Sequence, residues 1–244
     1  MRRYFIYLSY AGTAYCGWQN QPNGVTVQQR LEEALSLLLR EKIDVVGAGR
    51  TDAGVHARLM VAHFDYGGGE VLGDLVGKLN GILPCDISVD RIVEVDSGSH
   101  ARFDAVSRTY QYFICLRKDS FYHPFHLRTR YDLDFVEMNR AAALLLDYTD
   151  FGSFCKAHSD NRTNRCHITE AVWAPAGVAG EWVFTIRADR FLRNMVRAIV
   201  GTLLDVGRGK ITVEDFRMII ESGDRSLAGA SAPACGLFLA GIEY

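Results

Sequence analysis

The stretch TVQQRLEEALSLLL, residues 26–39, shows the spacing of an amphipathic helix. Its apolar side chains recur at positions i, i+3, i+4, i+7 and i+8, which places them on one helical face: Leu31, Ala34, Leu35, Leu38 and Leu39. Thr26 followed three residues later by Gln29 is the pattern of a capping box. We therefore expect a helix that begins after Thr26 and packs its leucine face against a sheet.

Strand signals surround this helix. Residues 4–10, YFIYLSY, are aromatic and β-branched, and glycines and a proline after them indicate a long loop. Residues 43–46 (IDVV), 58–66 (RLMVAHFDY) and 86–96 (DISVDRIVEVD) predict further strands, and residues 72–83 (LGDLVGKLNGIL) predict a shorter helix. The order strand-helix-strand-strand-helix-strand is that of a ferredoxin-like unit, with helices on one face of an antiparallel sheet.

The second half of the chain repeats this scheme. Its predicted elements are a strand at 107–117, a helix at 134–146 capped by Asp134, a hairpin at 168–177 and 181–189, helices at 191–207 and 212–222 with Thr212 as a cap, and a last strand at 236–244. The predicted fold class is therefore α+β. We expect two ferredoxin-like (RRM-like) halves, residues 1–104 and 105–244, whose antiparallel sheets join around a central cleft.

The composition limits the function classes. The chain has 244 residues, and 27 basic against 29 acidic side chains give a net charge of −2. Its N-terminus shows no signal peptide pattern, and no run of 18 apolar residues occurs, so we expect a soluble, cytoplasmic protein. If the partner is a nucleic acid, the basic residues must gather on one face.

The cysteines do not indicate a metal site. Six scattered cysteines without a C-x-x-C pair are expected to be reduced thiols. Cys155, His158, Cys166 and His167 lie close in sequence, but their spacing matches no common zinc motif. We expect no metal.

Residues 47–57, GAGRTDAGVHA, carry the most unusual chemistry of the chain. They do not match a dinucleotide-binding loop, because Asp52 stands where that motif needs its third glycine. A phosphate-binding P-loop is absent as well. A turn in which Asp52 only caps backbone amides remains an equally good interpretation of the pattern alone.

Two features favour a catalytic Asp52. Glycines and alanines on both sides leave a bare backbone that a bulky ligand could approach closely. Arg50 lies two positions earlier, on the same face of extended backbone, where its charge would keep the carboxylate ionised. A single ionised carboxylate does not suit an ordinary glycosidase, which needs two, but it suits attack on a sugar C1′ or a pyrimidine C6.

The motif resembles the active-site motif of the TruA-type tRNA pseudouridine synthases. The resemblance extends over nearly the whole chain, in family order, through GTAYCGWQNQP, TVQQRLEEAL, LNGILPCDISV, ARFDAVSRTYQY, FLRNMVRAIVGTLLDVGRGK and APACGLFLAGIEY. One departure is Ala11, where family members commonly have an aspartate in the sequence Tyr-Asp-Gly-Thr.

This resemblance implies an isomerase that converts uridine to pseudouridine at positions 38, 39 and 40 in the anticodon stem-loop of tRNA. It implies no cofactor, no metal, and a homodimer that holds one tRNA. Asp52 would be the nucleophile, or in the competing glycal mechanism the base that takes the C2′ proton. Tyr110 would stack on the uracil, Arg50 would pair with Asp52 or fill the gap left by the flipped uridine, and Leu237 would pack under the base.

Other residues are assigned by their chemistry. Arg197 lies in an otherwise apolar helical run, where a buried arginine wants a carboxylate, and Asp52 is the candidate. Core packing is the alternative for Leu237 and Tyr110, and we expect Tyr112 to be a core residue. RNA backbone contacts are expected from basic residues in two polar segments: Lys156, Arg162, Arg165, Arg128 and Arg130.

Two other function classes fit the sequence less well than an isomerase. A tRNA-binding protein of the same fold without activity would have no reason to keep Arg50, Asp52 and Tyr110 together. An RNA-recognition module would need an RNP-type aromatic run on a strand, and none occurs.

Overall fold

The computed structural model describes residues 1–68, 74–120, 124–156, 162–177 and 179–244. The fold is mixed α+β. The chain forms two compact units, one of Met1–Val106 with Phe238–Tyr244 and one of Ser107–Leu237. The division therefore falls two residues after the predicted boundary at 104, and it groups the last seven residues with the first unit rather than with the second.

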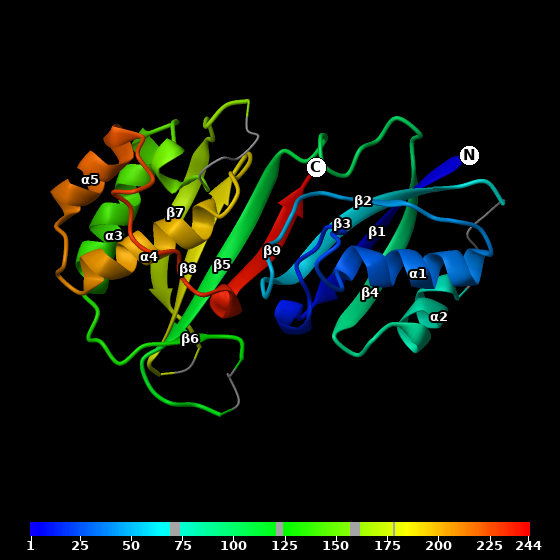
Figure 1. Cartoon of the computed structure of the whole chain (residues 1–244), viewed down its shortest axis with the longest axis horizontal. Coiled ribbons are helices and arrows are strands. Elements are labelled where there is room, and N and C mark those ends of the chain that lie inside the picture. Colours follow the sequence, from blue (N-terminus) through cyan, green and yellow to red (C-terminus); the bar gives the residue numbers. More distant parts are fainter. Residues whose placement is uncertain (69–73, 121–123, 157–161, 178) are drawn as a thin grey trace. The chain divides into compact units, whose positions relative to one another are not determined.

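The first unit is built on a sheet with β1 at its centre (Figure 1). Its strands are β1 (Arg2–Tyr10), β2 (Val45–Gly47), β3 (His56–Tyr66), β4 (Ile87–Val95) and, except for its first residue, β9 (Leu237–Glu243). β1 pairs antiparallel with β4 on one side and with β3 on the other. β2 pairs antiparallel with the second half of β3, and β9 pairs parallel with the first two residues of β3.

Two helices, α1 (Val27–Leu39) and α2 (Leu75–Ile82), belong to this unit. Leu31 and Leu35 on the predicted face of α1 are fully buried, which confirms the periodicity. The Thr26 hydroxyl accepts a hydrogen bond from the backbone N–H of Gln29, as a cap should. The predicted capping box is only half formed, because the side chain of Gln29 donates to Glu33 instead.

The second unit carries three antiparallel strands, β5 (Ser107–Cys115), β7 (Ile168–Pro175) and β8 (Glu181–Ala188), in the order β5-β8-β7. The short strand β6 (Leu127–Arg128) pairs with β5. The helices α3 (Phe135–Leu144), α4 (Met195–Gly207) and α5 (Val213–Ser222) lie together in Figure 1. The predicted helix caps Asp134 and Thr212 both accept backbone N–H bonds, and Thr212 forms a complete capping box with Asp215.

Two sequence expectations are wrong. The sheets are not wholly antiparallel, because β3–β9 and β5–β6 are parallel pairs. β9 reaches its place through a long connection, which a parallel pair requires. α4 begins four residues later than predicted, because Asn194 before it has left-handed backbone, with φ at 65°.

Within the described part of the chain, every helix is too short or too polar to span a bilayer.

Candidate active site

Asp52 lies in a tight turn between β2 and β3. The backbone N–H of Val55 donates to the carbonyl of Asp52 at 3.1 Å, which closes a four-residue turn. Gly54, its third residue, has φ of 77°, the conformation for which glycine is preferred at that position of a type II turn. Thr51 before the turn and Val55 at its end are buried, whereas Asp52 is partly exposed. The turn thus presents one carboxylate from a backbone that is fixed on both sides.

A loop that follows β1 holds this turn. We call residues 10–18, YAGTAYCGW, the clamp segment. The N–H of Trp18 donates to the carbonyl of Thr51 at 3.2 Å, and the N–H of Gly54 donates to the carbonyl of Tyr15 at 3.3 Å. The hydroxyls of Tyr10 and Thr51 share a buried hydrogen bond of 2.8 Å. The residues on either side of Asp52 are therefore both bonded to one segment.

Glycines permit the close contact between these segments. A Cβ on Gly17, whose φ is 87°, would lie 2.4 Å from the carbonyl oxygen of Thr51, and a Cβ on Gly12 would lie 1.9 Å from that of Val55. A Cβ on Gly47 would lie 2.4 Å from the indole nitrogen of Trp18. The sequence suggested that small residues make room for a ligand. At Gly47 the structure gives another reason, because the protein's own tryptophan occupies that space.

His56 joins the turn to two other segments. Its buried ring accepts a hydrogen bond at Nδ1 from the N–H of Gly12 at 2.9 Å, so the ring nitrogen that accepts is unprotonated. The same ring stacks on Phe238 of β9, with 4.7 Å between ring centroids. These contacts join residues far apart in the chain, so no local sequence pattern indicates them.

The clamp segment is itself anchored at Asp86. The N–H of Ala11 donates to the carbonyl of Asp86 at 2.9 Å, and the hydroxyl of Tyr15 donates to its carboxylate at 2.6 Å. Burial, with this bond to a carboxylate second, raises the pKa of Tyr15 above its usual value, so the phenol stays protonated and keeps donating. Ala11 precedes the short 3-10 helix Gly12–Ala14 without a side-chain cap.

A polar network holds the chain after the clamp segment. The carboxylate of Glu32 on α1 accepts from the Asn20 side chain at 2.7 Å, from the Gln28 side chain at 2.8 Å and from the N–H of Val45 at 2.9 Å. The Thr26 hydroxyl donates to Asn20 at 2.8 Å. One acid thus connects the loop, the helix and β2, which leads into the Asp52 turn.

Arg50 is exposed. Its expected pairing with Asp52 stays a prediction. The other role expected of Arg50, insertion where a uridine flips out, stays a prediction.

Two tyrosines of β5 in the second unit have different surroundings. Tyr110 is partly exposed and meets the ring of Phe191 edge to face, with 5.1 Å between centroids and 86° between planes. Tyr112 is fully buried and donates to the carbonyl of Pro233 at 2.9 Å, and burial raises its pKa. The prediction that Tyr112 is a core residue is confirmed. The role predicted for Tyr110 stays a prediction.

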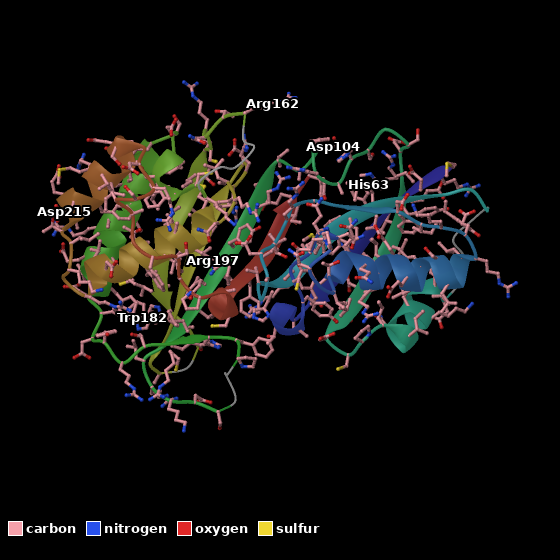
Figure 2. The ribbon with its side chains drawn as sticks, in the orientation of Figure 1. His63, Asp104, Arg162, Trp182, Arg197 and Asp215 are labelled. Carbon is pink, nitrogen blue, oxygen red and sulfur yellow. The ribbon has the colours of Figure 1, made fainter. Side chains whose placement is uncertain are left out.

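Arg197 on α4, labelled in Figure 2, is half-buried. Its Nε donates to the carbonyl of Ala232 at 2.7 Å, and the N–H of Ala232 donates to the carbonyl of Arg197 at 2.8 Å. A Cβ on Gly201 would lie 1.8 Å from the carbonyl oxygen of Ala230, so this segment runs directly against α4. The predicted bond from Arg197 to Asp52 stays a prediction. Leu237 follows this segment and is buried.

All five basic residues expected to contact RNA are exposed: Lys156, Arg162, Arg165, Arg128 and Arg130. His158, part of the zinc pattern that the sequence argued against, lies outside the described residues. Among the described residues, no three of His, Cys, Asp and Glu form a group that could hold a metal ion.

Comparison with known proteins agrees with the motif. A family model described as tRNA pseudouridine synthase matches residues 6–104 and 141–244. Proteins named tRNA pseudouridine synthase A are similar over the whole chain, with 58% identity in Parabacteroides distasonis (96% of that protein covered) and 57% in Bacteroides thetaiotaomicron (91% covered). A relative of the same name from Acetivibrio thermocellus, covered completely, is 41% identical. The chain belongs to the tRNA pseudouridine synthase family.

Proposed function

We propose that this protein converts uridine to pseudouridine at positions 38, 39 and 40 in the anticodon stem-loop of tRNA. Family membership supports an isomerase that acts on tRNA. The observation that carries the assignment to a site is the Asp52 turn, whose backbone is bonded to the clamp segment on both sides of the acid. Such fixing is what a catalytic carboxylate needs in order to meet a base at one geometry.

The proposed chemistry needs one carboxylate. The uridine leaves the helical stack, and Asp52 either adds to the substrate at C1′ or C6 or removes the C2′ proton. The N1–C1′ bond breaks, the uracil rotates, and C5 bonds to C1′. The proton at C5 is then lost to solvent, so one hydrogen from C5 is released for each uridine converted.

The substrate-binding residues are part of the same proposal. The ring of the partly exposed Tyr110 stacks on the uracil, and Arg50 pairs with Asp52 or fills the place of the flipped base. Arg197 pairs its charge with the Asp52 carboxylate, and Leu237 packs under the base. The exposed basic residues named above bind phosphates, which makes affinity depend on salt.

We also propose that the chain is built from two ferredoxin-like halves, residues 1–104 and 105–244, and acts as a cytoplasmic homodimer. The order β4-β1-β3-β2 in the first unit, with helices between β1 and β2 and between β3 and β4, supports the first half of this assignment.

The test is tritium release from an unmodified tRNA transcript labelled at C5 of its uridines. We predict tritium release that disappears when positions 38, 39 and 40 are replaced by cytidine. Tight, salt-sensitive binding without release would favour a tRNA-binding protein instead. Release that persists in the replaced transcript would contradict the assigned positions.

A further inference from the structure

A compact turn precedes the second unit. We call residues 100–104, HARFD, the His100 turn. The ring Nδ1 of His100 accepts from the backbone N–H groups of Arg102 and Phe103, at 3.1 and 3.3 Å. The N–H of His100 donates to the carboxylate of Asp104 at 2.7 Å, and the N–H of Asp104 donates back to the carbonyl of His100 at 3.1 Å. One imidazole and one carboxylate thus fix the backbone.

The remaining N–H of the turn is bonded to the sheet. Ala101 donates to Nδ1 of His63 on β3 at 3.2 Å, and its carbonyl accepts from the hydroxyl of Tyr244 at 2.8 Å. Burial, and the charge of Arg3 after it, lower the pKa of His63 to about 4, so the ring is neutral near pH 7 and can accept. Figure 2 labels His63 on β3 and Asp104 in the His100 turn. All five backbone N–H groups of the turn are therefore satisfied.

This rigid turn presents an aromatic ring to solvent. Phe103 is 76% exposed, more than any other phenylalanine among the described exposed apolar side chains. Its ring lies on that of His100, with 4.2 Å between centroids and 32° between planes, which restricts its orientation. The guanidinium of Arg102 lies 5.9 Å from the ring centroid.

Stability of the fold does not explain why this turn holds a phenylalanine in solvent. The exposed ring of Phe103 buries little apolar area and therefore stabilises the folded state little. A fixed aromatic face beside a cation is the combination that binds unpaired nucleotides, because any base can stack on the ring while the cation pairs with a phosphate. Asp104, the carboxylate of the turn, accepts a backbone N–H and so serves the turn itself.

We propose that Phe103 and Arg102 form a second RNA contact, outside the Asp52 turn, in which Phe103 stacks on an unpaired base of the tRNA and Arg102 binds an adjacent phosphate. The proposal rests on the proposed function, because it takes tRNA as the ligand. It makes Phe103 a residue of substrate binding and not of chemistry.

The test compares steady-state kinetics and filter-binding affinity on one tRNA transcript. Phe103→Ala should raise KM and Kd about tenfold and leave kcat unchanged, because a lost stack on one base weakens binding by about that factor. Phe103→Trp should restore affinity, since an aromatic face is all that stacking needs. Arg102→Gln should weaken binding and flatten its salt dependence. Val136→Ala on α3, at a valine 71% exposed, is the matched control and should change nothing.

The outcomes separate the possible errors. Wild-type protein that releases no tritium from the transcript would overturn the proposed function itself. If wild type is active and Phe103→Ala keeps its KM and Kd, the second RNA contact is wrong. If Phe103→Ala instead converts a dimer to monomers in sedimentation while each monomer binds tRNA normally, the ring belongs to an interface between copies, and this proposal is also overturned. Melting temperatures show whether a variant is folded.

Discussion

At the scale of single residues, the position of Asp52 depends on two glycines of the clamp segment, which have no side chain. Gly12 and Gly17 lack the Cβ that would collide with the carbonyls of Val55 and Thr51. These carbonyls belong to the chain on each side of the acid. A side chain at Gly12 or Gly17 would therefore displace the backbone beside Asp52 and move its carboxylate without contacting it.

Gly17→Ala should lower kcat at least tenfold, because the new Cβ would lie 2.4 Å from the Thr51 carbonyl and must displace the backbone that carries Asp52. Gly223→Ala is the control: Gly223 also has positive φ, at 65°, but a Cβ there meets no atom within 4 Å. Both variants should lose about 1 kcal/mol or more of stability from the left-handed backbone, measured by urea unfolding. Equal kcat in the two variants would contradict the role of the clamp segment.

His63 makes stability depend on pH. Its pKa of about 4 in the folded protein lies below the ordinary value of 6.5, so between these values the unfolded chain binds more protons at this residue. We expect the free energy of unfolding to fall by roughly 2 kcal/mol from this residue as pH drops from 7 to 4. His63→Asn, which can still accept from Ala101, should show a shallower pH dependence in urea titrations. An unchanged dependence would show that other groups cause the acid sensitivity.

The hydrogen bonds that hold the Asp52 turn could not be predicted from the sequence. The motif predicted a polar turn around Asp52, because its glycines and acid are local signals. The contacts of Tyr10 with Thr51 and of Gly12 with His56 span more than forty positions, and no spacing rule describes them. Only the family resemblance indicated that the segment GTAYCGWQNQP is functionally important.

At the scale of elements, α1 does more than cover the sheet. Its leucine face is buried, and on another side Glu32 accepts three hydrogen bonds that hold the loop after the clamp segment and the start of β2. In the part of the chain that the structure describes, neighbouring Glu33 bonds to Gln29 and Arg30 of the same helix. Two adjacent glutamates thus offer a natural comparison.

Glu32→Ala should destabilise the protein by about 2 kcal/mol and reduce kcat, because its loss leaves the partly buried N–H of Val45 and the side-chain amide of Asn20 without their acceptor. Glu33→Ala should cost less than about 0.5 kcal/mol, since it removes only exposed contacts within the helix. Thermal melts and tritium release on both variants measure the difference. Equal costs would mean that the network does not position the loop.

Element types were predictable because helices and strands have local periods and caps. Thr26, Asp134 and Thr212 all cap the helices that they were predicted to begin. The two wrong predictions depended on the backbone conformation of a single residue and on pairing between strands far apart in the sequence. α4 begins later than predicted because Asn194 has a positive φ, which asparagine permits but does not require. The parallel pairing of β9 with β3 joins residues 238–239 to residues 56–57, which are far apart in the sequence.

At the scale of the whole molecule, a net charge of −2 must coexist with an RNA substrate. Affinity then depends on a few exposed cations that contact phosphates, since the bulk charge does not attract RNA. The sequence could name such cations only by their polar surroundings. The structure adds that each of the five predicted ones is exposed.

Arg162→Gln and Arg165→Gln should each weaken tRNA binding and reduce the slope of log Kobs against log salt by about one, because each releases one fewer counterion. Lys42→Gln is the control, since Lys42 already pairs with Asp44 at 2.9 Å on the surface. Filter binding over a range of potassium chloride concentrations measures the slopes. Slopes unchanged in all three variants would remove these arginines from the RNA interface.

The role of Asp52 is tested by tritium release from C5-labelled tRNA with the variant Asp52→Asn, with tRNA affinity measured in parallel. Asp90→Asn, at an exposed aspartate on β4 of the same unit, serves as the matched control. We predict that Asp52→Asn loses at least about a thousandfold in rate and keeps its affinity, because it loses the reacting carboxylate and little else. Release near the wild-type rate, or a large loss of tRNA binding, would contradict the claim that Asp52 performs the chemistry.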